Sequence, residues 1–159
     1  MAIIGISCDN DNISYVVIDG TANSPKVLDC ETYPLKQIEK GELLDSANHR
    51  IETLIKKHQI TKAAILVVDK IIGSTKTHPV KHQIEGVIIY KFFKERIPCI
   101  EYSRNKKLTT DFKNKLNISI DLKPSKIDKF IEERFSELCK KDVTNKNQRE
   151  AFAIALTQL

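Results

Sequence analysis

The chain opens with hydrophobic segments separated by short polar turns, which is typical of neighbouring β-strands. The first segment is an apolar run that ends at Ser7-Cys8, and the Asp-Asn-Asp-Asn stretch at 9–12 follows it with residues that favour turns. Two more hydrophobic segments come after this turn. The pattern predicts an antiparallel meander of three strands, at residues 2–8, 13–19 and 26–33.

The rest of the chain alternates strands with helices. The segment AAILVVD at 63–69 is apolar on both faces, which predicts a strand covered by helices on both sides. A further short strand is expected at 97–103. Apolar residues at helical spacing predict helices at 45–58, with Asp45 or Ser46 as N-cap, and at 80–96, 106–115, 126–140 and 147–157.

This order of elements predicts an α/β fold built on one mixed five-stranded sheet, with three antiparallel strands followed by parallel strands and with helices on both faces. The pattern alone leaves other α/β folds open. We find no internal repeat and no low-complexity linker, so we expect a single domain spanning residues 1–159.

Composition narrows the class of protein. The longest apolar runs fall well short of the ~20 residues that span a bilayer, and the N-terminus lacks the basic region of a signal peptide. We therefore expect a cytoplasmic protein with no membrane partner. The four cysteines, at 8, 30, 99 and 139, have no CxxC spacing, which favours small buried side chains over a zinc site.

Charge is distributed unevenly along the chain. Residues 1–90 carry 10 Lys and Arg against 11 Asp and Glu, whereas residues 91–159 carry 16 against 10, a net charge of +6. A basic half of this kind is typical of a nucleic-acid-binding surface. The alternative is a lysine-rich surface that is simply solvated.

Six strings, taken in order, resemble the RuvC branch of the RNase H-like superfamily over nearly the whole chain. They are IIGIS, AILVVD, HQIEGVIIY, IPCIEYSRNKKLTT, SKIDKFIEERF and REAFAIAL. A small uncharacterised bacterial family of the same fold is also similar, especially near Gln148–Ala155. The resemblance implies an RNase H-like mixed sheet, a nucleic-acid partner and a homodimer.

The resemblance also implies a particular chemistry. Nucleases of this family use two Mg²⁺ or Mn²⁺ ions, held by four carboxylates, to hydrolyse a phosphodiester. Position by position, the first acid falls on Ser7 and the second on Asp69. The two acids of the last helix fall on Asn147 and Glu150. Two of the four positions are therefore neutral in this chain.

Other acids offer replacements for the missing pair. Asp9 follows Ser7 on the same side of the first strand, and Glu85 lies on the helix after the central strand. The predicted catalytic and metal-ligating set of a Mg- or Mn-dependent endonuclease is thus Asp9, Asp69, Glu85 and Glu150. In the alternative interpretation, Asp9 belongs to its turn, Glu85 faces solvent, and Glu150 occupies the first helical turn that favours acids.

The last part of the predicted site is a set of basic residues expected to contact phosphate. Lys106 and Lys107 match a position where the family places a basic residue against phosphate, and Arg104, Lys113, Lys126 and Lys129 extend that surface. Tyr102 either stacks on a base or packs on the core. Two functions follow: a metal-dependent nuclease acting on structured DNA or RNA, or a catalytically degenerate domain that binds nucleic acid or a protein partner without cleavage.

Overall fold

Strand β1, Ile3–Cys8, lies at the centre of a five-stranded sheet. The computed structural model describes residues 1–35, 39–67, 79–103, 109–139 and 145–159. The sheet has the order β3-β2-β1-β4-β5, in which β2 (Asn12–Thr21) and β3 (Ser24–Pro34) run antiparallel while β4 (Lys62–Val67) and β5 (Cys99–Ser103) run parallel to β1. The predicted mixed sheet is confirmed.

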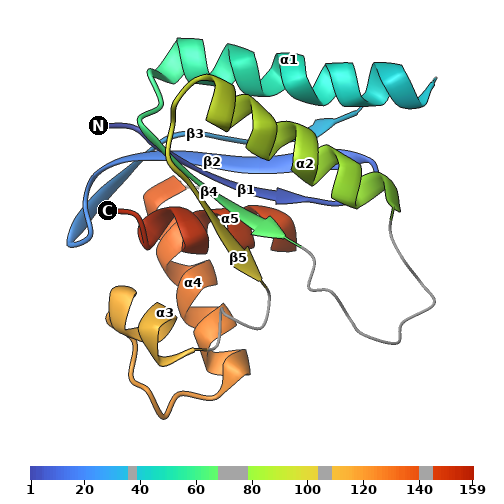
Figure 1. Cartoon of the computed structure of the whole chain (residues 1–159). Helices are drawn as coiled ribbons and strands as arrows, with labels where there is room; N and C mark the ends of the chain where they lie inside the picture. The colour runs from blue at the N-terminus through green and yellow to red at the C-terminus, as the bar shows by residue number, and fades with distance from the viewer. Residues whose placement is uncertain (36–38, 68–78, 104–108, 140–144) are drawn as a thin grey trace.

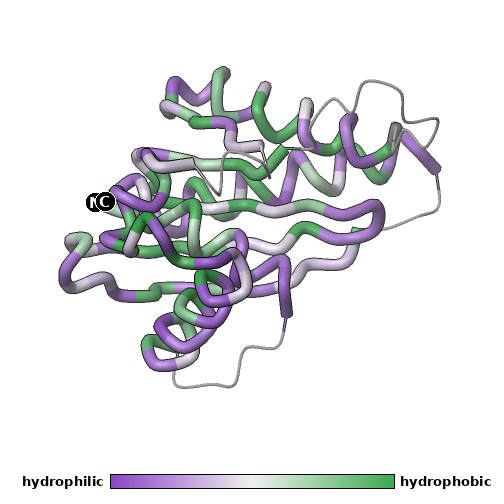
Figure 2. The backbone as a smooth tube through the Cα atoms, turned by 90° about the horizontal axis from the view of Figure 1, so that it is seen from below, coloured by the Kyte–Doolittle hydropathy of each residue, from purple (hydrophilic) through white to green (hydrophobic). Residues whose placement is uncertain are grey.

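Helices cover both faces of this sheet (Figure 1). On one face lie α1 (Lys40–His58) and α2 (Pro79–Lys94), and on the other lie α3 (Thr110–Lys115), α4 (Pro124–Cys139) and α5 (Lys146–Leu156). Because side chains alternate along a strand, Ile3 of β1 joins the α4–α5 core while Ile4 and Ile6 join the α1–α2 core. The strands are hydrophobic along much of their length, and hydrophilic residues gather at the turns (Figure 2).

Helix α5 packs directly on β1. A Cβ atom placed on Gly5 would lie 1.9 Å from the carbonyl oxygen of Ala151 and 2.9 Å from the methyl group of Ala155. Phe152 stacks on Phe135 of α4 with 4.6 Å between ring centroids, which joins the two helices. The alanine-rich face of α5 is therefore the surface that brings this helix close to the sheet.

Several helix boundaries differ from the sequence-based expectation. Helix α3 begins at Thr110, with Thr109 as N-cap, and not at residue 106, and α4 begins at Pro124, two residues earlier than expected. Helix α1 begins at Lys40, with Glu39 as N-cap, so the prediction of Asp45 or Ser46 as N-cap is wrong. The reason is Leu43, which is buried one turn earlier than Ala47 and extends the apolar face. Helix α2 ends at Lys94, before Arg96 adopts a left-handed backbone with φ 57°. None of the helices in the described ranges is long and apolar enough to cross a membrane.

Candidate functional site

Three hydroxyl side chains form a polar row across the sheet. Ser7 of β1 pairs with Ser14 of β2, and Ser14 pairs with Thr32 of β3. Ladder partners point to the same face, so the three side chains lie at one level on three adjacent strands. The hydroxyl oxygens of Ser14 and Thr32 are 2.9 Å apart. Ser7 and Ser14 are both buried, and buried hydroxyls require partners within the protein.

The first turn of α5 supplies several of those partners. Asn145 caps this helix, because its side-chain oxygen accepts hydrogen bonds from the backbone N–H groups of Asn147 and Gln148. The amide nitrogen of Asn145 also donates to the Thr32 hydroxyl at 2.9 Å, and that of Gln148 donates to the same oxygen at 3.2 Å. The start of α5 is thus fixed above β3 by side-chain hydrogen bonds.

Glu150 lies against Ser7. The Ser7 hydroxyl donates to Oε2 of Glu150 at 3.2 Å, and only 4% of Glu150 is exposed. The same glutamate lines a cavity of about 130 Å³ between α4 and α5. The other lining residues are Asp128, Ile131, Lys146 and Arg149. The acid that the family resemblance placed on the last helix is therefore buried at the sheet, next to the serine that replaces the first-strand acid.

Asp9 is tied both to its turn and to α5. Its Oδ1 accepts hydrogen bonds from the backbone N–H of Asp11 at 2.9 Å and from the side chain of Asn12 at 3.1 Å. Its Oδ2 accepts a hydrogen bond from the side-chain amide of Asn147 at 3.1 Å. The structure therefore brings Asp9 to the first turn of α5, where Asn147 replaces one of the expected aspartates.

Glu85 has a different environment from Glu150. It is buried on α2, where its carboxylate lies 3.9 Å from Nζ of Lys81 and 3.5 Å from Nδ1 of His82. Burial, and next the negative charge of Glu85, raise the pKa of the Cys8 thiol. Cys8 belongs to the α1–α2 core, whereas Ser7 points toward α5. Glu85 and Glu150 thus meet side chains on opposite faces of β1.

Asp69, the acid predicted on the central strand, lies outside the described residues. The described part of its strand ends at Val67, and the preceding Leu66 pairs with Ser7 in the parallel ladder. In the ranges that the structure describes, no three His, Cys, Asp or Glu side chains are grouped so that they could hold a metal ion. Asp9 contacts Asn147 of α5, and Glu150 of α5 contacts Ser7 of β1, whereas Glu85 has Lys81 and His82 as its ionic neighbours.

The predicted basic surface also lies partly inside and partly outside the described residues. Arg104, Lys106 and Lys107 lie outside the described residues. Lys113 donates to the backbone carbonyls of Ile120 and Leu122, so its ammonium group holds the α3–α4 connection.

Two lysines of the predicted surface are open to solvent on α4. Lys126 is exposed, and Lys129 is 76% exposed with Glu133 at 3.6 Å. Lys126 and Lys129 of α4 therefore stay available to a ligand.

Tyr102 is a core residue. It is buried on β5, with its ring 6.1 Å from that of Phe112 in an edge-on arrangement. Its hydroxyl accepts hydrogen bonds from Thr157 at 3.0 Å and from Gln158 at 3.2 Å. These contacts fix the C-terminal end of α5 and exclude the alternative in which this ring stacks on a base.

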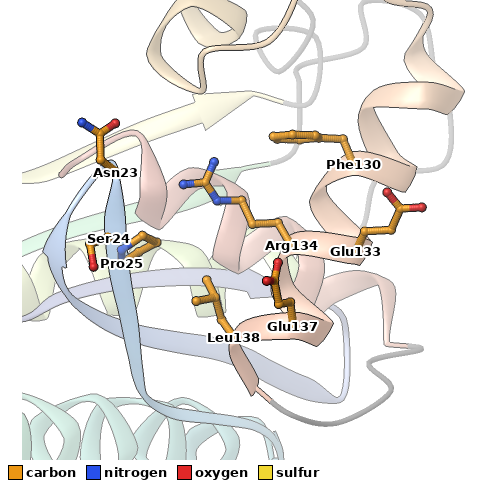
Figure 3. A pocket seen from close by; sticks show the side chains of 8 residues that line it. All are labelled: Asn23, Ser24, Pro25, Phe130, Glu133, Arg134, Glu137 and Leu138. Carbon is orange, nitrogen blue, oxygen red and sulfur yellow. The ribbon is translucent and has the colours of Figure 1, made fainter.

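A larger hollow of about 510 Å³ lies between the β2–β3 turn and α4 (Figure 3). Arg134 reaches across it and donates to the carbonyl oxygen of Ala22 at 2.8 Å. Glu133 and Glu137 also line it, so a phosphate backbone would meet negative charge there. Arg134 therefore joins the β2–β3 turn to α4. The hollow itself is not part of the candidate site.

Sequence reasoning missed the polar row and its link to α5. One signal was present in the sequence: Ser7 and Ser14 lie symmetrically about the 9–12 turn, so a tight hairpin makes them ladder partners. The partners of Thr32 had no such signal, because Asn145 and Gln148 are more than a hundred residues away.

The sheet order and the position of α5 define an RNase H-like fold of the RuvC type. No protein-family model and no curated protein matches the sequence. Solved structures do match. Thermus thermophilus RuvC superposes with a TM-score of 0.74 at 14% identity, over 99% of this chain and 92% of that one. The same protein in complex with a Holliday junction substrate matches with the same score, at 15% identity and over 91% of its length.

Two further resolvases are similar. The fowlpox virus resolvase, solved with Holliday junction DNA, matches with a TM-score of 0.56 at 18% identity, covering 99% of this chain and 96% of that chain. The yeast mitochondrial Holliday junction resolvase matches with a TM-score of 0.56 at 10% identity, covering 98% and 75%. The RuvC-like fold expected from the sequence is thus confirmed, and at these identities the likeness concerns the fold alone.

Proposed function

We propose that this chain is a RuvC-like protein that binds structured nucleic acid without cleaving it by a two-metal mechanism. One observation carries the proposal. The two neutral residues at expected acid positions, Ser7 and Asn147, each donate a hydrogen bond to a nearby acid, Glu150 and Asp9 respectively.

These hydrogen bonds matter because of what a two-metal centre requires. Mg²⁺ and Mn²⁺ sites in nucleases need several carboxylates around two ions about 3.5–4 Å apart. Here two of the expected acid positions, Ser7 and Asn147, are neutral, and among the described acids Glu150 and Asp9 each accept a hydrogen bond from a neutral side chain. The described residues do not fit such a centre, so we derive no metal-dependent step.

Nucleic-acid binding is supported by charge and by the fold. Residues 91–159 carry the net charge of +6, and Lys126 and Lys129 are exposed on α4. Asp128 and Ile131 of the same helix line the cavity at Glu150, so these lysines lie on the helix that borders the candidate site. Two of the structural neighbours were solved with Holliday junctions, which makes branched DNA the first ligand to test.

A binding titration tests the proposal. Fluorescence anisotropy with a labelled four-way junction, its duplex arms and a single strand should show binding that weakens linearly as the logarithm of salt concentration rises. The same substrates incubated with Mg²⁺ or Mn²⁺ should stay intact on a denaturing gel. Binding with no salt dependence, or no binding at all, would contradict the proposal and favour a protein-binding scaffold.

The second candidate is a divalent-metal-dependent endonuclease with the rearranged ligand set Asp69, Glu150, Asp9 and Glu85. It is favoured by the position of Asp9, which contacts Asn147 in the first turn of α5, and of Glu150, which lies three residues after Asn147 on the same helix. This candidate predicts junction cleavage in Mn²⁺ that Glu150→Gln and Asp69→Asn each abolish. Cleavage that both variants retain would come from a contaminating nuclease.

A further inference from the structure

Two half-buried cysteines face each other between the sheet and α4. Cys30 lies on β3, and Cys139 is the last residue of α4. Their sulfur atoms are 4.0 Å apart, although 109 positions separate the two residues in the sequence. Both side chains pack against the α4–α5 core and keep part of their surface accessible. The proposed function makes no use of this pair.

The other two cysteines have different surroundings. Cys8 is fully buried in the α1–α2 core, and burial raises the pKa of its thiol. Burial, and next the charge of Glu101, raise the pKa of the Cys99 thiol to about 12. Because the thiolate is the form that reacts with oxidants, these two side chains are poorly suited to oxidation at neutral pH. The short sulfur–sulfur distance singles out Cys30 and Cys139 as a reactive pair.

The pair lies next to the start of α5. Cys30 and Thr32 point to the same face of β3, because side chains alternate along a strand. Cys139 meets the first of them, and Asn145, the N-cap of α5, donates a 2.9 Å hydrogen bond to the hydroxyl of the second. The end of α4 and the start of α5 therefore contact one strand at positions two residues apart. A bond between the two sulfur atoms would fasten α4 beside the cap of α5.

We propose that Cys30 and Cys139 form a site of oxidative modification, at which a hydroperoxide converts the two thiols into a disulfide that fastens α4 to β3. The thiolate of one cysteine attacks the peroxide, whose O–O bond breaks to give a sulfenic acid and one water. The thiolate of the other cysteine attacks that sulfur, forms the S–S bond and releases a second water. The two thiols lose two hydrogens in total, and the peroxide is reduced to two waters.

The structure permits this step with a small movement. The sulfur atoms must approach from 4.0 Å to about 2.05 Å, and one of them belongs to the last residue of a helix, where the chain frays most readily. In the folded chain, Arg134 already joins α4 to the β2–β3 turn through the carbonyl oxygen of Ala22. A disulfide adds a covalent link between segments far apart in sequence, which restricts the unfolded chain strongly. This site is independent of the proposed nucleic-acid function.

Comparison of the reduced and the peroxide-treated chain tests the inference. Treated wild type should lose about 2 Da, the mass of two hydrogens, and its melting temperature should rise by about 5–15 °C. Dithiothreitol should reverse both changes. Cys30→Ser and Cys139→Ser should each show neither change, whereas Cys99→Ser, at a cysteine of β5 that is also half-buried, should respond as the wild type does. Circular dichroism should show that each variant is folded, and Cys139→Ala repeats the test with an apolar side chain.

Hydrogen exchange gives a local measurement of the same event. In the oxidised chain, exchange should slow in the last turn of α4 and at the backbone N–H groups of Asn147 and Gln148, which the Asn145 cap holds. Exchange at the start of α1, across the sheet, is the internal control and should change less.

Several outcomes would overturn the inference. Treated wild type that keeps its full complement of thiols does so, as does a disulfide that joins two chains or includes Cys8 or Cys99. An intramolecular bond between Cys30 and Cys139 that leaves the melting temperature unchanged would show that α4 is not fastened by it. A temperature rise that persists in Cys139→Ser and Cys139→Ala would assign the effect to another residue. Each of these results leaves junction binding, which is measured separately, unaffected.

Discussion

The hydroxyl of Ser7 donates a 3.2 Å hydrogen bond to the carboxylate of Glu150, which lies 143 residues further along the chain. The bond crosses the buried interface between β1 and α5. It places a neutral donor and one acid where a RuvC-type nuclease is expected to have two acids. A change at Ser7 therefore tests both the packing of α5 and the charge balance of the candidate site.

Ser7→Asp should destabilise the fold at neutral pH by about 2–4 kcal/mol, because it sets two buried carboxylates against each other. Two carboxylates this close repel each other once both are ionised, so the loss of stability in this variant should grow as pH rises. Urea unfolding from pH 5 to 8 measures this slope relative to wild type. Ser7→Asn, which is neutral and close in size, is the control; equal slopes for the two variants would contradict the prediction.

Gly5→Ala should lower the free energy of unfolding by about 1–3 kcal/mol or more, because the new methyl group overlaps the carbonyl oxygen of Ala151. Strand β1 and helix α5 must then separate. Gly41→Ala is the matched variant: its methyl group meets open space in α1, and it should stabilise the chain by up to about 1 kcal/mol. Thermal melts of the two variants should move in opposite directions, and a stable Gly5→Ala protein would refute the close packing of α5.

The ionised carboxylate of Asp29 should stabilise the fold at neutral pH and should cease to do so at low pH, where it becomes protonated. Its partial burial opposes ionisation, but hydrogen bonds from Lys57 at 2.7 Å and His58 at 2.9 Å outweigh it and lower the pKa of the carboxyl. The stabilisation is present above the unfolded pKa of about 3.9 and is lost as pH falls through the folded pKa. Asp29→Asn should therefore cost about 1 kcal/mol at pH 7 and almost nothing near pH 2. A loss that is the same at both pH values would mean that packing, and not charge, is responsible.

Cys30 and Cys139 should form an intramolecular disulfide on oxidation with diamide, which takes up the two thiol hydrogens. Their sulfur atoms are 4.0 Å apart, between β3 and α4. Cys99 should react slowly, because burial and then the charge of Glu101 raise its pKa to about 12. Peptide mapping after alkylation identifies the pair, and Cys139→Ser should remove the cross-link. A dominant disulfide between any other two cysteines would contradict the geometry.

Lys129→Ala should weaken junction binding and reduce its salt dependence by about one released counterion if α4 contacts phosphate. Lys56→Ala is a matched control. Both lysines are exposed, at 76% and 73%, and each has a glutamate four residues away along its helix, but Lys56 lies on α1 across the sheet. An equal effect of the two substitutions would show that net charge alone governs binding.

The order and type of the elements could be predicted from the pattern of residues along the chain. The apolar run at 63–69 indicated a strand covered on both faces, because hydrophobic periodicity follows the burial of each residue. The start of α1 was missed because Leu43 gains its burial from a tertiary contact, which competes with the capping preference of Asp45 and Ser46.

Contacts between polar side chains from distant segments depend on the tertiary fold and could not be predicted from the pattern of residues. Asp9 and Asn147 are distant in sequence, yet they share a hydrogen bond because α5 crosses the sheet above the first turn. Glu85 and Glu150 were both predicted to lie at the candidate site. Their neighbours on β1 are Cys8 and Ser7 respectively, and the alternation of side chains along the strand puts these two residues on opposite faces of the sheet. Contacts of this kind depend on how α5 and α2 are placed against the sheet, which no local pattern of residues encodes.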